Sequence, residues 1–496
     1  MSKSKKFVPD WYHEKAPERS YRSILKWGDP EAFKAPNAKL YELMKETFHM
    51  TDDDFKVKQE MGLEEVDYDI PCRLSDDQIA ALEAIVGKAN VSTDNYDRLS
   101  VAYGKTMVDL MRLRKHIVEN VPDAVVYPKN REDIIALVKY CCEQKIPMYV
   151  YGGGSSVTRG AGQNSSYYGK IEDIVISQEY VTPIGIIKSD EFPRNATGPS
   201  IDQIMMGSEG TFGILTHVTL RVFKYMPENR KKFSYVFKDW ENGLNAAREI
   251  MQGEFGFPSV FRLSDPEETS IAFRLYGVAD TVIDKMLAAK GYKDGKRVLM
   301  LGWSEGEKHF SKNVAKQIDK ICKKHGAMYT TSIVTKGWEK GRFTDPYLRE
   351  DMGDYGLMLD TLECSVNWDN FTNVYENVRR FCKSRPDTIC MTHMSHFYPQ
   401  GANLYFIFEA KMNDLDEYLE YQRGIMDNIQ KYGAAMSHHH GIGKMTAPWL
   451  EAQIGKNQMD IYRALKQHFD PDNLMNPGGT LGLDLPEDQK RDFINK

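Results

Sequence analysis

The chain has 496 residues, and its 65 lysines and arginines against 71 aspartates and glutamates give a formal net charge of -6. A chain of this length is too long for one hydrophobic core, so we expect two or more domains. The near balance of charge, without a long run of one sign, argues against a nucleic-acid partner. The seven cysteines form no CxxC pair, which argues against a zinc or iron–sulfur centre.

The sequence carries no recognisable targeting segment. Its first residues, MSKSKKFVPDWYHEK, lack the apolar core of a secretory signal, and no stretch approaches the roughly 18 continuous apolar residues of a membrane helix. An odd number of cysteines favours a reducing compartment. We therefore expect a cytoplasmic protein.

Residues 1–100 are charged and favour helices, and we interpret them as an accessory region. The first strongly patterned unit begins at Asn130, which can cap a helix that has apolar residues on one face. A strand is predicted at residues 146–151, and two more at residues 171–176 and 184–187.

A glycine-rich loop directly follows the first of these strands. It consists of Gly152, Gly153, Gly154, Ser155 and Ser156. Without Cβ atoms in the way, consecutive backbone N–H groups can converge on a phosphate group. The same glycines can also form a tight surface turn, and both interpretations are open at this point.

A second glycine-rich loop, residues 207–213, leads into a predicted strand at residues 214–223. Its glycines recur every third residue and permit close backbone approach, while Ser208 and Thr211 can donate hydrogen bonds. Neither loop matches the Rossmann motif or a Walker A motif. We therefore expect a nucleotide-binding fold of another kind.

After Pro227 the sequence changes to longer units in which strands and helices alternate. This pattern predicts an α+β second domain. Strands are expected at residues 233–237, 298–303 and 404–408, and helices at residues 243–251, 309–325, 414–431 and 458–468.

Three consecutive histidines, His438, His439 and His440, stand between Ser437 and Gly441. Adjacent side chains cannot all face one point, so we predict no metal site here, even with His393 and His396 as further ligands. Imidazole titrates near neutral pH, which favours general acid–base catalysis. The alternative is an exposed polar loop.

Several segments together carry a family resemblance. They read YGGGSSV, YGKIEDIV, ATGPSIDQIMMGSEGTFGILTHVTL, SVFRLSD and SHHHGIGK. In this order they resemble the alkyldihydroxyacetonephosphate synthase family of the vanillyl-alcohol-oxidase, PCMH-type flavoenzyme superfamily. Many oxidases of the superfamily have an acidic residue before a single His-Gly-Ile-Gly, whereas the triple histidine resembles the synthases.

The resemblance implies FAD as the cofactor and an exchange of the acyl group of acyl-dihydroxyacetone phosphate for a fatty alcohol. It therefore implies a lipid-like phosphate ester and a fatty alcohol as partners, and leaves open a peripheral membrane contact and a homodimer. Two alternatives are an FAD-linked 2-hydroxy-acid oxidase or dehydrogenase and a remnant that binds no flavin.

The resemblance also assigns roles to individual residues. Tyr405 would act as an acid–base group with His438, His439 and His440, and Arg349, Arg262 and Thr361 would bind substrate. Each arginine could instead form an ordinary surface ion pair. The residues assigned to FAD are Gly152, Gly153, Gly154, Ser155, Ser156, Thr197, Gly198, Ser208, Glu209, Thr211 and Ile214.

The resemblance implies an α+β fold in four parts. They are a helical accessory region (1–100), a PCMH-type FAD-binding domain (101–226), an α+β cap domain for the substrate (227–432) and a C-terminal segment with the histidines that packs on the FAD domain (433–496). In the family several strands and a helix follow the first glycine loop, so the resemblance implies an FAD domain that is shortened near residues 157/158.

Overall fold

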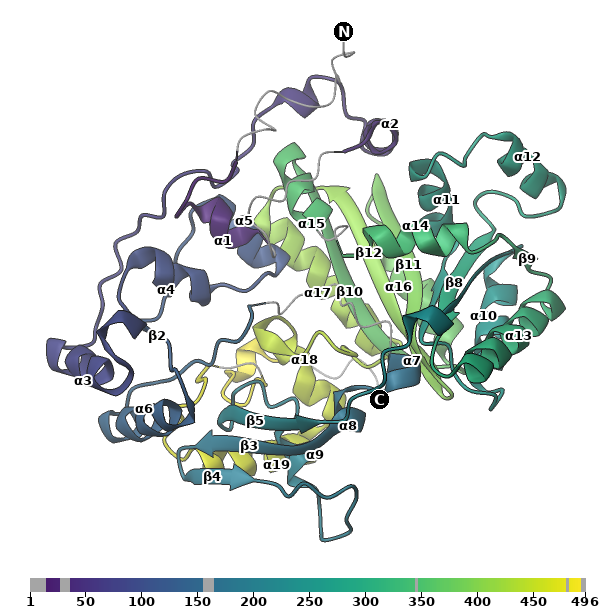
Figure 1. Ribbon diagram of the computed structural model, residues 1–496. Coiled ribbons are helices and arrows are strands. Elements are labelled where there is room, and N and C mark those ends of the chain that lie inside the picture. Colours follow the sequence, from purple (N-terminus) through teal and green to yellow (C-terminus); the bar gives the residue numbers. More distant parts are fainter. Residues whose placement is uncertain (1–14, 27–35, 155–164, 344–346, 479–480, 492–496) are drawn as a thin grey trace.

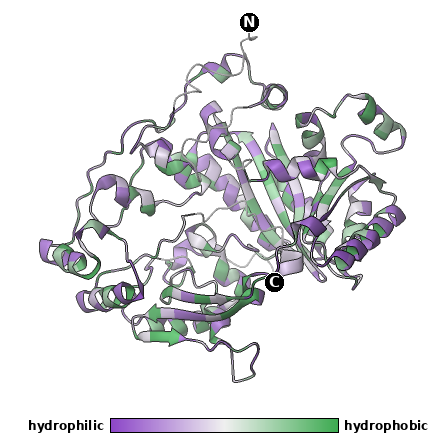
Figure 2. Ribbon diagram, viewed as in Figure 1, coloured by the Kyte–Doolittle hydropathy of each residue, from purple (hydrophilic) through white to green (hydrophobic). Residues whose placement is uncertain are grey.

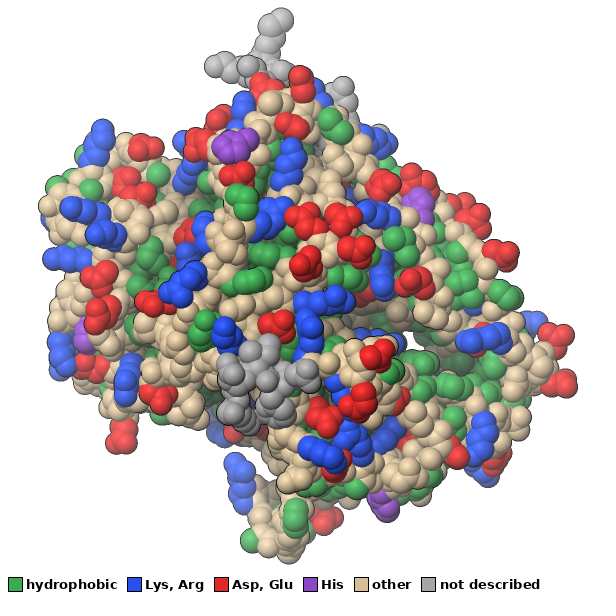
Figure 3. Space-filling view, turned by 180° about the vertical axis from the view of Figure 1, so that it is seen from behind, with side chains coloured by type: hydrophobic (Ala, Val, Ile, Leu, Met, Phe, Trp, Pro, Cys, Tyr) green, Lys and Arg blue, Asp and Glu red, His purple; other side chains and the backbone are tan. Residues whose placement is uncertain are grey.

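The computed structural model describes residues 15–26, 36–154, 165–343, 347–478 and 481–491 (Figure 1). The α+β class is confirmed, with a large sheet, a small sheet and a helical N-terminal region. Among the described residues, no helix combines the length and the hydropathy that crossing a membrane requires. Figure 3 shows acidic and basic side chains interspersed over one face of the molecule.

The large sheet has seven strands in the order β10-β12-β11-β7-β8-β6-β9, and neighbouring strands are antiparallel. The strands are β6 (Lys231–Phe237), β7 (Val260–Ser264), β8 (Val298–Ser304), β9 (Met328–Tyr329), β10 (Leu357–Asn367), β11 (Thr388–Tyr398) and β12 (Gly401–Lys411). The helices around it are α10 (Trp240–Met251), α11 (Pro266–Leu275), α12 (Val282–Ala289), α13 (Lys308–Lys324), α14 (Ile333–Gly341), α15 (Tyr347–Met352), α16 (Phe371–Cys382) and α17 (Leu415–Lys431).

The residue pattern of the long strands decides which face of the sheet is covered (Figure 2). On β12, Leu404, Phe406 and Phe408 are fully buried in the main core with residues of α16 and α17. Successive side chains point to opposite faces of a strand, so Asn403 and Tyr405 project from the other face. That second face carries the candidate site.

The small sheet has the strand order β4-β3-β5, with β3 (Val175–Thr182), β4 (Gly185–Lys188) and β5 (Ile214–Leu220). One face packs on α9 (Ile201–Met205) and α19 (Lys456–Phe469) through Tyr180, Phe212 and Phe469. Helix α6 (Arg131–Gln144) also contacts β3 and β5, so the sheet is held between helices distant in sequence.

The N-terminal region consists of short helices and one two-stranded sheet. These elements are α1 (Tyr21–Leu25), α2 (Ala38–Phe48), α3 (Asp76–Val86), α4 (Asn95–Ala102), α5 (Met107–Arg114), β1 (Val91–Ser92) and β2 (Val125–Val126). Helix α1 is fastened to the cap by buried ion pairs from Arg22 to Asp351 and Asp354, at 2.9 and 2.8 Å. A buried charge left unpaired is costly, so these pairs fix where the helix docks.

Two strand predictions are wrong. Residues 146–151 form no strand, and among the described residues they make a single β-bridge, from Met148 to Met475. Residues Ile171–Ile174 form a helical turn, α8, whose start is capped by the Asp173 carboxylate, and β3 begins only at Val175. The predicted cap at Asn130 is confirmed, since its side chain accepts the Asp133 N–H.

Candidate active site

A row of polar side chains crosses four strands of the large sheet. Glu363 on β10 is the register partner of Tyr405 on β12, Tyr405 of His393 on β11, and His393 of Ser264 on β7. Paired residues of an antiparallel sheet point to the same face. The rings of His393 and Tyr405 stack with their centroids 4.8 Å apart. The row thus presents a phenol and an imidazole on the face away from α16 and α17.

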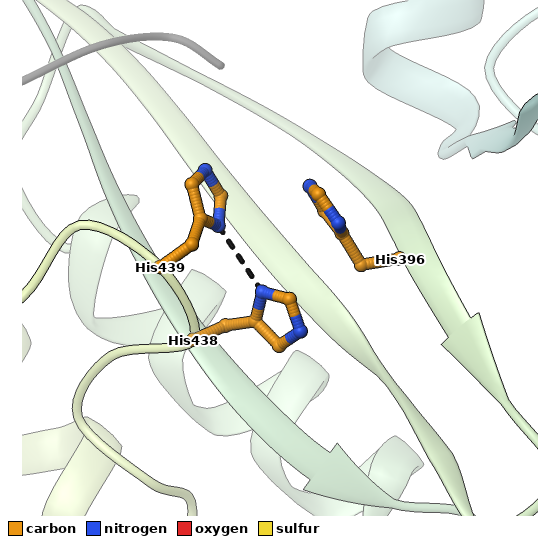
Figure 4. A group of neighbouring side chains, drawn as sticks. All are labelled: His396, His438 and His439. Atoms are coloured by element: carbon orange, nitrogen blue, oxygen red, sulfur yellow. Dashed lines mark hydrogen bonds between the residues drawn. The ribbon is translucent and has the colours of Figure 1, made fainter. Parts of the chain in front are cut away.

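A β-bulge in β11 adds His396 to this face. The register with β12 shifts between Ser395 and Tyr398, and His396 adopts a left-handed backbone with φ +48°. Such a conformation costs a residue with a side chain roughly 1–2 kcal/mol and recurs at functional sites. The bulge turns the ring of His396 towards the histidine loop, to 4.6 and 4.7 Å from the centroids of His438 and His439 (Figure 4).

The buried carboxylate of Glu363 holds the histidine loop in place. Its Oε1 accepts the backbone N–H groups of His438, His439 and His440 at 2.8, 2.8 and 3.0 Å, and the Ser437 hydroxyl at 2.9 Å. Burial alone would raise the pKa of Glu363, but the hydrogen bonds and the nearby imidazoles hold it well below its usual range. The loop is therefore wrapped around a fixed negative charge.

A second carboxylate, Glu209, holds the other end of the same loop. It accepts the N–H groups of Ile442 and Gly443 at 2.7 and 3.0 Å, where α18 (Gly443–Ile454) begins. The N–H groups of a first helical turn lack partners within the helix and favour an anion. Asn476 donates to the Glu209 carbonyl at 3.0 Å. The second glycine loop and β10 thus hold the histidine loop from two sides.

A continuous chain of hydrogen bonds runs through the site. Tyr405 bonds to Nε2 of His439 at 2.5 Å, and His439 bonds to His438 between their Nδ1 atoms at 3.1 Å. His438 bonds to the Tyr398 hydroxyl at 2.7 Å, and Tyr398 donates to Ser165 at 3.2 Å. Ser165 lies on α7 (Ser165–Tyr168), and its hydroxyl forms a hydrogen bond with Nδ1 of His396 at 2.7 Å.

Burial holds two histidines of this chain, His396 and His438, in the neutral form, together with the neighbouring His440. Burial lowers the pKa of His438 and of His440 to about 4, and lowers that of His396 well below its usual value. With neutral rings the hydrogen bonds can all have the same direction, from the phenol of Tyr405 towards His396. Such an arrangement can move a proton by successive transfers.

Nitrogen atoms of His396, His438 and His439 lie within 4.8 Å of one another. All three rings already have hydrogen-bond partners among the described residues, in the hydroxyls of Ser165, Tyr398 and Tyr405. These partners suit proton transfer.

Both predicted substrate arginines are largely buried. Arg262 on β7 donates to Glu268 at 2.6 Å and contacts Nδ1 of His393 at 3.1 Å, so it lies directly behind the ring that stacks on Tyr405. Arg349 on α15 lies 3.2 Å from Asp360 and donates to the Lys105 carbonyl at 2.8 Å. Neither guanidinium forms an ordinary surface pair.

A cavity of about 370 Å³ lies beside Arg349, between α5 and the edge of the large sheet. Its apolar wall consists of Met107, Leu110, Met111, Leu357, Met358 and Met412. Thr361 projects from the site face of β10 two residues before Glu363, and its buried hydroxyl has no hydrogen-bond partner in the part of the chain that the structure describes.

The two glycine loops fit a phosphate-bearing cofactor. A Cβ atom added to Gly210 would lie 3.4 Å from the Val150 side chain, so the loops lie side by side. No atom lies within 4 Å of a Cβ atom added to Gly152 or to Gly207, so a ligand can approach the backbone at both positions. The buried Thr211 hydroxyl has no partner among the described residues. A phosphate oxygen could accept a hydrogen bond from the Thr211 hydroxyl and from backbone N–H groups of the loops.

The other predicted cofactor residues are placed differently. Ser208 is buried in the second loop, and Ile214 begins β5 opposite Val181. Thr197 and Gly198 lie on an exposed loop before α9, where Thr197 bonds to Asn195, and no described contact brings them to the glycine loops. Gly153 and Gly154 follow Gly152 in the first loop, while Ser155 and Ser156 lie outside the described residues.

Three comparisons agree on the kind of protein. A family model described as "FAD linked oxidases, C-terminal domain" matches residues 226–480, and one described as "FAD binding domain" matches residues 122–165. The chain is 25% identical to the alkyldihydroxyacetonephosphate synthase of Dictyostelium discoideum, over 84% of this chain and 82% of that protein. It is 30% identical to an uncharacterized FAD-linked oxidoreductase of Escherichia coli, over 66% and 67%.

Two further matches are to a dehydrogenase and to a solved synthase structure. A D-lactate dehydrogenase of Anaerostipes hadrus is 24% identical over 66% of this chain and 68% of that protein. The fold resembles a solved alkyldihydroxyacetonephosphate synthase with a TM-score of 0.75 at 23% identity, over 92% of this chain and 99% of that one. The PCMH-type FAD-binding fold and FAD as the cofactor follow from these matches.

Proposed function

Because this chain belongs to the family of FAD-linked oxidases, we propose that it is an FAD-dependent enzyme that exchanges the acyl group of acyl-dihydroxyacetone phosphate for a fatty alcohol. The observation that carries the proposal is the pair of Tyr405 and His439, which starts a chain of hydrogen bonds. The same structure has a buried arginine beside a cavity that has an apolar wall. The similar synthase of Dictyostelium discoideum supports this reaction.

The proposed exchange requires controlled proton movement. One C–O bond breaks and another forms, so a carboxylate leaves while the alcohol loses its proton. The Tyr405 oxygen can take up the alcohol proton as its own proton passes to His439, and the chain beyond His439 can carry the charge onward. Bound FAD supplies a ring that accepts and returns electrons. The first glycine loop, Gly207 and Thr211 would hold its phosphates.

Substrate recognition would rest on Arg349 and the cavity beside it. The contacts of Arg349 with Asp360 and with the Lys105 carbonyl leave further N–H groups of its guanidinium for a phosphate or carboxylate. Six apolar side chains form one wall of the cavity, charged residues such as Arg114 and Lys115 line the rest, and its volume of about 370 Å³ lies in the range of small-molecule sites. An alkyl chain would lose its contact with water there.

A second candidate function is the oxidation of a 2-hydroxy acid. Arg262 lies beside His393 on the site face, and a guanidinium in that position suits a carboxylate. The similarity to the D-lactate dehydrogenase of Anaerostipes hadrus supports this alternative. The two functions differ in one respect that can be measured, because only the oxidation leaves the flavin reduced.

The test begins with the absorbance spectrum of the purified protein after incubation with FAD and desalting. The holoprotein is then supplied with palmitoyl-dihydroxyacetone phosphate and labelled hexadecanol, and the labelled ether product is measured. Ether formation supports the proposal. Anaerobic bleaching of the flavin by D-lactate or glycolate, without ether formation, would establish the second candidate. A protein that retains no flavin would be a flavin-free remnant.

A further inference from the structure

Helix α12 and the turn before it carry an apolar surface at the rim of the cap. Its residues are Tyr276, Val282, Ile283 and Met286, which are 61, 74, 64 and 55% exposed. Figure 1 shows α12 projecting from the body of the molecule after α11, and Figure 2 shows the helix largely in the hydrophobic colour. Four large apolar side chains gathered within eleven residues are unusual for a free surface.

Folding of α12 does not account for these exposed side chains. The inner side of the helix is fixed by Leu287, which is 4% exposed and packs in a small core with Phe273 and Tyr292. An amphipathic helix normally presents polar residues on the side opposite such a contact. In α12 the outer side is apolar instead, so we infer that it meets an apolar environment.

The charges around this surface are mainly positive. Two of the nearby acids, Asp284 and Asp294, bond to the buried Arg297 at 2.5 and 3.3 Å, whereas Asp280 forms no ion pair with a described residue. None of the surrounding lysines forms an ion pair with a described residue. These exposed lysines are Lys285, Lys290, Lys293 and Lys296.

We propose that this rim of the cap docks on the surface of a membrane that contains anionic lipids. The apolar side chains of α12 would enter the boundary between headgroups and acyl chains, while the lysines would meet lipid phosphates. A second copy of the chain suits this surface less well, because a twofold contact would bring the lysines of both copies together. The proposal does not depend on the reaction proposed above.

The experiment is cosedimentation of the FAD-loaded protein with vesicles of phosphatidylcholine, with and without phosphatidylglycerol. The test variant is Ile283→Asp, and the matched control is Ile461→Asp on α19, where the isoleucine is similarly exposed at 59%. We expect binding to the anionic vesicles that Ile283→Asp weakens by about tenfold and Ile461→Asp leaves unchanged. The double variant Lys285→Glu/Lys290→Glu should weaken binding similarly, and added salt should reduce it.

Three results would overturn the proposal. One is wild-type protein that fails to bind anionic vesicles, and another is equal weakening by the two aspartate variants. The third is a dimer in light scattering that Ile283→Asp converts to monomer without any change in vesicle binding, which would assign the surface to a second copy. Thermal unfolding of each variant checks that the fold is intact.

Discussion

Tyr405 and His439 are 34 residues apart in the chain, yet their hydroxyl and Nε2 atoms lie 2.5 Å from each other. A strand of the large sheet supplies the phenol, and a loop held at both ends by carboxylates supplies the imidazole. The contact therefore joins a strand of the large sheet to a loop that the second glycine loop also holds.

The Tyr405→Phe variant removes the hydroxyl and keeps the ring that stacks on His393. We expect turnover to fall by roughly 10²- to 10⁴-fold, because a positioned acid–base group is lost, while flavin absorbance is unchanged. The control is Tyr421→Phe, which also loses a buried phenol, one that donates to the Cys382 carbonyl away from the site. Equal losses in both variants would show that Tyr405 has only a packing role.

The Ser165→Ala variant interrupts the chain of hydrogen bonds between Tyr398 and His396. If protons travel along this chain, turnover falls and its solvent isotope effect changes. The neighbouring Ser166 is a matched control, because its hydroxyl accepts the Phe397 N–H outside the chain. Ser166→Ala should leave the isotope effect as in the wild type, and the same change in both variants would exclude the relay.

The Glu363→Gln variant removes the charge at the centre of the histidine loop. We expect a loss of about 1–3 kcal/mol in the free energy of unfolding at pH 7, since charge-assisted hydrogen bonds to three N–H groups are weakened. The pKa of Glu363 is lowered by folding, so its stabilisation is present above about pH 4.3 and disappears as the pH falls further.

Urea unfolding at a series of pH values tests this expectation. The gap between wild type and Glu363→Gln should be widest near neutral pH and should close in acid. A gap that stays constant with pH would mean that the charge of Glu363 does not stabilise the loop.

Two buried histidines should make the protein sensitive to mild acid. The pKa values of His438 and His440 are lowered to about 4, whereas both residues titrate near 6.5 when unfolded. Their neutral forms stabilise the fold above about pH 6.5, and this contribution falls as the pH decreases towards 4. The double variant His438→Gln/His440→Gln should therefore show a flatter pH dependence of its urea midpoint over this interval, and parallel curves would contradict the assignment.

The Gly441→Ala variant tests the packing between the histidine loop and Glu209. A Cβ atom at Gly441 would lie 2.7 Å from a Glu209 carboxylate oxygen, and φ there is +82°. Gly277 has φ +69° and nothing within 4 Å, so Gly277→Ala carries the backbone strain without the clash. We expect Gly441→Ala to lower the melting temperature more and to weaken flavin retention, whereas equal shifts would mean that Glu209 simply moves aside.

Local chemistry made part of this structure predictable. Residue patterns predicted the helix N-cap at Asn130 and strands of the large sheet. The resemblance led to Tyr405. Residues 146–151 are apolar enough for a strand. A strand also needs a neighbouring strand to pair with, and the sequence of the segment alone does not show whether one is present.

The supporting residues of the site were missed for a related reason. Glu363 stands in the apolar strand segment LMLDTLECSV, where Asp360, Thr361, Glu363 and Ser365 break the hydrophobic pattern. That break was a usable signal for a site facing β10. The position of His396 depends on a bulge, and that of Ser165 on contacts between distant elements, so neither could be read from spacing alone.

Glu209 and Glu363 come from separate halves of the molecule and hold successive N–H groups of one loop. A substitution at either position would therefore loosen the histidine loop even though the other carboxylate still binds its own N–H groups. Among relatives, we expect the two carboxylates to be inherited as a pair, kept together where the triple histidine is kept and lost together where it is lost.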